Sequence, residues 1–94
     1  MSEKNKTLHV VEGVGEAIIT LSRKAKANGV EVETLKMREP TVGDQERAQE
    51  STSSDTATEV QLFASLCQVS PDDIRGLPLR DYKRLQSAYV LFTT

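Results

Sequence analysis

Apolar and polar residues alternate in the first half of the chain, whereas in the second half the apolar residues recur at helical spacing. The run Ala17–Leu21 is apolar and rich in β-branched residues, and residues 30–38 alternate apolar with polar. Asn28-Gly29 separates the two runs, and this dipeptide is the strongest short-range signal for a hairpin turn. We therefore predict a β-hairpin over residues 16–38.

The strand register within this hairpin follows less directly. A two-residue Asn-Gly loop would place Leu21 opposite a lysine, which mixes apolar and charged side chains on one face. Pairing Leu21 with Leu35 and Ile19 with Met37 keeps the apolar side chains together. The apolar phase also changes within the second strand, so we predict a β-bulge near Glu33-Thr34 or a loop longer than two residues.

The pattern becomes helical after Pro40. Thr41 suits an N-cap, and Asp44 falls at the third helical position, where a carboxylate favours the helix dipole. We expect this helix to run from about Val42 to about Glu50. The tract at residues 51–56 is rich in Ser and Thr, whose side chains compete with helical hydrogen bonds, so it is predicted to be a loop.

Three further helix signals follow. Thr56–Glu59 repeats the capping signature before an apolar stripe that consists of Val60, Phe63, Ala64 and Cys67, broadened by Leu62 and Leu66. Ser70–Asp73 combines a serine cap, a proline and two acids, and Gly76 ends that short helix. The last helix is expected from about Leu79 to about Phe92.

These elements predict a single α+β domain with one N-terminal β-hairpin packed on about four helices, the third very short. We assign the domain to residues 14–94, with the hairpin at 16–38 and the helical part at 41–93. Residues 1–13 are polar enough to be predicted as a flexible leader. A domain of this size buries a modest fraction of its surface, so binding a partner could add noticeably to its stability.

Charge and hydropathy limit the classes of function. The chain has 12 basic and 14 acidic residues, so it offers no overall electrostatic attraction for nucleic acid. No apolar run approaches the length of a membrane span, and the first residues lack the apolar core of a signal peptide. A cytosolic protein is the expectation.

Few residues suit catalysis or metal binding. The single histidine, His9, lies in the predicted leader, and the single cysteine, Cys67, is expected to be a buried residue of a helix. Asp72-Asp73 is better explained as a helix cap than as an acid pair. Gly13 and Gly15 precede a strand, whereas a phosphate-binding loop leads from a strand into a helix. We therefore predict no enzyme, no metal and no cofactor.

The last predicted helix carries the candidate binding surface. Its apolar stripe has the core as its default role, but residues 90–92 lie at the end of the sequence, where little remains to cover them. An exposed apolar end could bind a partner. The candidate partner-binding residues are Tyr82, Leu85, Tyr89 and Phe92.

The start of the same helix allows a different function. Four basic residues gather there and could contact phosphates, as in a small DNA-binding regulator. They are Arg75, Arg80, Lys83 and Arg84. Asp72, Asp73 and Asp81 lie among them and would cancel much of the field, so a solvated polar face is favoured over DNA contact.

Several segments occur in an order that resembles a known family. The segments are the strand–Asn-Gly–strand opening, Leu35–Thr41 followed by Asp44, Leu66–Ile74, Leu77–Tyr82, Leu85 and Phe92. Over residues 16–92 the chain resembles the small tail assembly chaperones of Mu-like and related contractile-tailed phages and prophages. Each segment alone is common, and their order and spacing carry the resemblance.

The resemblance implies an assembly role without catalysis. The implied partners are the tape-measure protein, the long helical rod that sets tail length, and other tail proteins as further candidates. Such chaperones keep the tape-measure protein soluble while tube subunits polymerise around it and are then displaced. This implies that the chain acts in the cytoplasm of the bacterial host, is absent from the finished virion, and contacts neither nucleic acid nor membrane.

Overall fold

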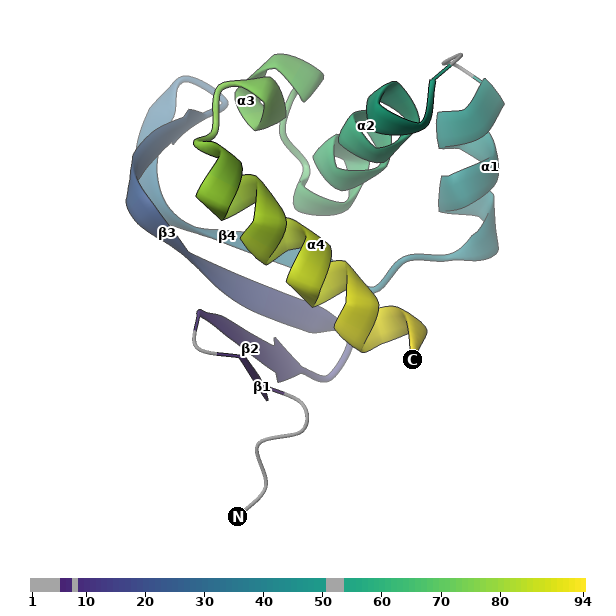
Figure 1. The fold of residues 1–94 in the computed structure, drawn as a ribbon, viewed down its shortest axis with the longest axis horizontal. Coiled ribbons are helices and arrows are strands. Elements are labelled where there is room, and N and C mark those ends of the chain that lie inside the picture. Colours follow the sequence, from purple (N-terminus) through teal and green to yellow (C-terminus); the bar gives the residue numbers. More distant parts are fainter. Residues whose placement is uncertain (1–5, 8, 51–53) are drawn as a thin grey trace.

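The computed structural model describes residues 6–7, 9–50 and 54–94, and their fold is α+β, as predicted (Figure 1). Within these ranges an antiparallel sheet with strand order β1-β2-β3-β4 is followed by four helices. The strands are β1 (Lys6–Thr7), β2 (Val10–Gly13), β3 (Glu16–Ala27) and β4 (Val30–Arg38). The helices are α1 (Val42–Glu50), α2 (Asp55–Cys67), α3 (Pro71–Arg75) and α4 (Leu79–Thr93).

The predicted hairpin is formed by β3 and β4. Ala27 pairs with Val30, so the loop contains only Asn28 and Gly29. Both loop residues have positive φ, 56° and 82° respectively, which is the backbone that favours Asn-Gly in a two-residue turn.

A large irregularity divides the hairpin, and it lies where the bulge was predicted. Thr20 pairs with Thr34 and Ala25 pairs with Val32, so the four residues of β3 between them face only Glu33. The extra residues therefore belong to β3. The expected pairs were wrong by two residues on β3, because Ile19 lies opposite Leu35 and Ala17 opposite Met37. The apolar faces still match, since both pairs are buried.

The prediction of a flexible leader is wrong for residues 6–7 and 10–13, which form β1 and β2. Val10 pairs with Ile19 and is fully buried, so β2 belongs to the sheet that supports the core. The turn between β2 and β3 holds Val14 and Gly15, and Gly15 has a φ of 76° that few other residues adopt. Residues 1–5 and 8 lie outside the described residues.

Three of the four helices have the predicted bounds to within a residue. Helix α2 differs because Ser54, rather than Thr56, is its N-cap: the Ser54 hydroxyl accepts a hydrogen bond from the amide of Ala57 at 3.1 Å. Asp55 and Thr56 therefore lie in the helix and not in the predicted loop, while residues 51–53 lie outside the described residues. Helix α3 begins with the predicted capping box between Ser70 and Asp73.

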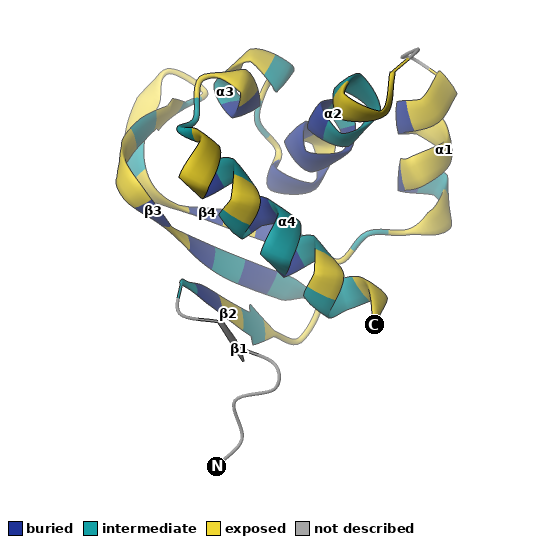
Figure 2. Ribbon diagram, in the orientation of Figure 1, coloured by how far each residue is buried: buried dark blue, intermediate teal, exposed yellow. Residues whose placement is uncertain are grey.

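The core lies between one face of the sheet and the helices (Figure 2). Helix α4 packs on β2 and β3, and α2 packs on β4. Helices α1 and α3 pack on α2, and α3 also reaches β3. The fully buried side chains with the largest volumes include Phe63, Ile19, Met37, Leu66 and Leu85. The sheet thus fixes where α4 and its first turn lie.

Candidate partner-binding surface

The first turn of α4 is fixed to the irregular part of β3. Asp81 is fully buried, and its two carboxylate oxygens accept hydrogen bonds from the amide and the hydroxyl of Ser22 at 2.8 and 3.0 Å. Arg84, one turn later, donates to the carbonyl of Thr20 at 2.9 Å and lies 3.7 Å from Asp81. Side chains of α4 therefore satisfy backbone groups of β3 at and beside the irregularity.

A second buried carboxylate joins the end of β4 to α1. Arg38 donates two hydrogen bonds of 2.8 Å to the two oxygens of Asp44, and Arg47 donates a third of 2.8 Å. Thr41 and Asp44 also form a reciprocal capping arrangement, as expected. The Arg38 guanidinium and the Thr41 donors hold the pKa of Asp44 well below its usual range, although burial opposes this. These contacts give Arg38, Thr41 and Asp44 a structural role, which is to join the end of β4 to the start of α1.

The four candidate partner-binding residues differ in exposure. Leu85 is fully buried, so a partner on the surface of the folded domain cannot contact it. Tyr82, Tyr89 and Phe92 are half-buried and pack against the core, with both tyrosine rings about Phe63 at centroid distances of 5.6 and 5.7 Å. The structure thus places most of this stripe in or against the core.

Large apolar side chains of α4 are exposed outside the predicted stripe. They are Val90, 52 % exposed near the end of the helix, and Leu79, 68 % exposed at its start. Leu79 borders a hollow of about 260 Å³ between α2, α3 and α4. Its lining is mainly apolar and comprises Thr56, Val60, Ile74, Arg75, Leu77, Leu79 and Tyr82. Tyr82 is the predicted residue that lines this hollow.

The ring of Tyr82 is held in the wall of this hollow by α2. Its hydroxyl donates a hydrogen bond to Glu59, which also accepts one from Gln86 at 2.8 Å. Burial and the neighbouring Glu59 carboxylate raise the pKa of Tyr82. The hollow therefore has one wall that is fixed by hydrogen bonds between two helices.

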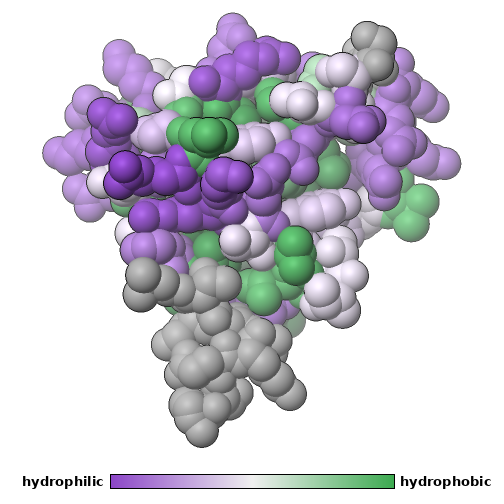
Figure 3. Space-filling model, viewed as in Figure 1, coloured by the Kyte–Doolittle hydropathy of each residue, from purple (hydrophilic) through white to green (hydrophobic). Residues whose placement is uncertain are grey.

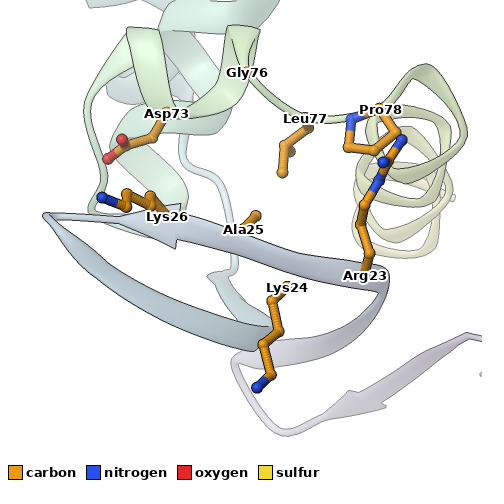
Figure 4. A pocket seen from close by; sticks show the side chains of 8 residues that line it. All are labelled: Arg23, Lys24, Ala25, Lys26, Asp73, Gly76, Leu77 and Pro78. Atoms are coloured by element: carbon orange, nitrogen blue, oxygen red, sulfur yellow. The ribbon is translucent and has the colours of Figure 1, made fainter.

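A larger hollow of about 530 Å³ lies on the other side of the loop between α3 and α4 (Figure 4). It is lined by Arg23, Lys24, Ala25 and Lys26 of β3 and by Asp73, Gly76, Leu77 and Pro78. In Figure 4 Arg23 extends from β3 toward Pro78, whereas Lys24 points to the opposite side of the strand. Leu77 lines both hollows, so they meet at this loop.

The basic start of α4 is partly occupied by contacts within the domain. Arg84 is bound to Thr20 and lies near Asp81, as described above, and its side chain is only 18 % exposed. Arg75 donates to Asp72 at 3.3 Å. Two of the four basic residues proposed for phosphate contact are therefore already engaged.

The residues weighed for catalysis have structural surroundings. Cys67 is buried, and burial raises the pKa of its thiol to about 12, which makes the thiolate scarce near neutral pH. Asp73 serves the cap of α3 and also accepts a hydrogen bond from the amide of Asn28 at 3.0 Å. In the described part of the chain, no group of three or more His, Cys, Asp or Glu residues could hold a metal ion.

Comparison with known families identifies the chain. A family model described as "phage tail assembly chaperone proteins, E, or 41 or 14" matches residues 18–94. The chain belongs to this phage tail assembly chaperone family. No curated protein and no solved structure matches the chain.

The match covers most of the described fold of this tail assembly chaperone. The matched region contains most of β3 and everything after it, including both buried carboxylates and the loop that separates the two hollows. Among the described residues of the chaperone, no helix has the length and apolar character that crossing a membrane requires.

Proposed function

We propose that this chain acts in phage tail assembly by binding the tape-measure protein and keeping it soluble, without catalysis of its own. The match of the tail assembly chaperone family to residues 18–94 carries this proposal. The action takes place in the cytoplasm of the bacterial host, and the chain is absent from the finished virion.

The surface of the domain supports a binding role. A tape-measure protein is a long helical rod, and apolar side chains on such helices need cover before assembly is complete. The domain offers an apolar hollow, and Leu79 at its border is largely exposed to solvent. A surface of this kind can shield the apolar face of a helix.

The DNA-binding alternative has less support. Of the basic residues near the start of α4, Arg84 and Arg75 are bound within the domain, which leaves Arg80 and Lys83 for phosphates. Few phosphate contacts provide only weak non-specific affinity at physiological salt.

Co-expression with the tape-measure protein of the same phage tests the proposal. We expect the tape-measure protein to be more soluble with this chain than with an unrelated small domain at equal expression, and to co-purify with it. Equal solubility in the two cultures, measured as the soluble fraction after centrifugation, would show that the chain is not its chaperone.

A further inference from the structure

The two hollows flank the loop between α3 and α4, and one has a mainly apolar lining whereas the other has a charged lining. Leu77 belongs to the lining of both, and Leu79 extends the apolar part into solvent. Figure 3 shows apolar surface near the junction of α3 and α4 beside a strongly hydrophilic region. We define the α3–α4 junction surface as these two hollows together.

The charged part of this surface has an excess of positive charge. Arg23 and Lys26 line it, and neither forms an ion pair within the described residues. Asp73 is the acid in the lining, and its carboxylate accepts hydrogen bonds from the backbone amides of Asn28 and Ser70. Both hydrogen bonds go to Oδ2 and lower the pKa of Asp73, and no ion pair joins this carboxylate to Arg23 or Lys26 within the described residues. Arg23 and Lys26 therefore remain available to a partner.

We propose that the α3–α4 junction surface binds an amphipathic helix whose apolar side chains enter the hollow beside Leu79 and whose acidic flank pairs with Arg23 and Lys26. This inference rests on the proposed function and specifies the partner's chemistry. Side chains one turn apart on a helix are about 5–6 Å apart, so one helix can serve neighbouring apolar and charged sites.

Nucleic acid fits this surface less well than an acidic helix. A phosphate backbone makes no use of the apolar hollow beside Leu79. A helix with an acidic flank can fill the apolar hollow and also pair with Arg23 and Lys26. Charge complementarity therefore selects the partner.

Two synthetic peptides test this chemistry without the tape-measure protein. Each is about 20 residues long, since shorter isolated helices are marginal in water. Both have the same leucine stripe, flanked by glutamates in one and by lysines in the other. Fluorescence anisotropy gives their dissociation constants with the whole chain, and we expect the acidic peptide to bind about tenfold or more tightly than the basic one.

Variants on the surface and matched controls locate the binding. We expect Leu79→Ser to weaken the acidic peptide about tenfold, because Leu79 is an exposed apolar anchor. Arg23→Glu with Lys26→Glu should reverse the preference between the peptides. The controls are Val90→Ser, at the other end of α4, and Lys36→Glu, on β4, and each should change binding less than about twofold. Circular dichroism checks that every variant is folded.

Any of three results in these binding assays would overturn the inference. The peptides could bind equally well, the surface variants could bind as the wild type does, or duplex DNA could displace the acidic peptide at physiological salt.

The proposed function is tested separately from this surface. If the acidic peptide binds as expected but the tape-measure protein stays insoluble, the surface is right and the function is wrong. If Leu79→Ser solubilises the tape-measure protein as well as the wild type, the function stands and this surface is wrong.

Discussion

Replacing Asp81 by alanine should destabilise the domain strongly, because the Asp81 carboxylate joins α4 to Ser22 of β3. The substitution removes both acceptors of the Ser22 amide and hydroxyl, and it leaves Arg84 without its nearby carboxylate. Because Asp81 is fully buried, the new side chain also leaves space that the helix packing cannot fill. The irregular segment of β3 would then lose its main contact with α4.

The size of this effect can be worked from the contacts. Hydrogen bonds to a charged group are worth about 1.5–3 kcal/mol in a buried setting, but Ser22 is itself exposed, so water can replace part of the loss. We expect a decrease in the free energy of unfolding of about 2–4 kcal/mol for Asp81→Ala. A domain of this size has about 5–14 kcal/mol in total, so the melting temperature should fall by about 10–25 °C.

Urea denaturation followed by circular dichroism measures the change, and Asp72→Ala is the matched control. Asp72 is also an acid in the first turn of a helix, but its side chain is 94 % exposed and its ion pair with Arg75 should contribute less than about 1 kcal/mol. A double-mutant cycle with Ser22→Ala should give a coupling energy of about 0.5–1.5 kcal/mol. If Asp81→Ala costs no more than Asp72→Ala, the bond between α4 and β3 does not hold the fold as described.

Three further predictions concern stability and reactivity. The pKa of Asp44 is lowered by folding, so the stability that Asp44 contributes should be complete above about pH 5 and decrease as the pH falls below about 4. Asp44→Asn should remove this decrease in the free energy of unfolding at acid pH, measured by urea denaturation. An unchanged pH dependence would contradict the role of Asp44. The Cys67 thiol, with its pKa raised to about 12, should react with a disulfide reagent only when the domain unfolds, and rapid labelling of the native protein would refute this. Gly29→Ala should lower the free energy of unfolding by about 1–2 kcal/mol, because Gly29 has a φ of 82°. Gly76→Ala should be neutral or slightly stabilising, because Gly76 has a φ of −78°. Similar melting temperatures for these two variants would contradict this prediction.

Local signals predicted much of the fold correctly. Asn28-Gly29 sets the hairpin loop, and Thr41 with Asp44 sets the start of α1, because the groups that interact are within a few residues of each other. The start of α2 was missed because several Ser and Thr residues precede it. Each of them could cap a helix, and Ser54 is the one that does.

Long-range contacts explain the remaining differences. Val10 is buried because β2 pairs with β3 and α4 packs on β2, and these are contacts that the sequence around Val10 does not reveal. The extra residues of β3 are stabilised by Asp81, whose sequence position indicates only a helix start. Periodicity could not separate Leu85, which is fully buried, from a surface residue of the same stripe.

Long-range contacts also explain why the candidate surface lies at the start of α4, near Leu79, whereas the sequence pointed to the end of this helix. Leu79 lies outside the apolar stripe, and Leu77 lies in a loop, so neither stands out by helical spacing. The hollows that they border are formed by side chains of β3, α2 and α3 together. Their Leu-Pro-Leu sequence within the family pattern was the available signal.

Amide hydrogen exchange of the chain, alone and with the tape-measure protein, shows whether the α3–α4 junction surface binds this partner. We expect amides near the α3–α4 junction, in residues 74–82, and in residues 23–27 of β3 to exchange more slowly in the complex. Exchange that is the same with and without the tape-measure protein would contradict binding, and slowing confined to the end of α4 or to other parts of the sheet would contradict the proposed surface.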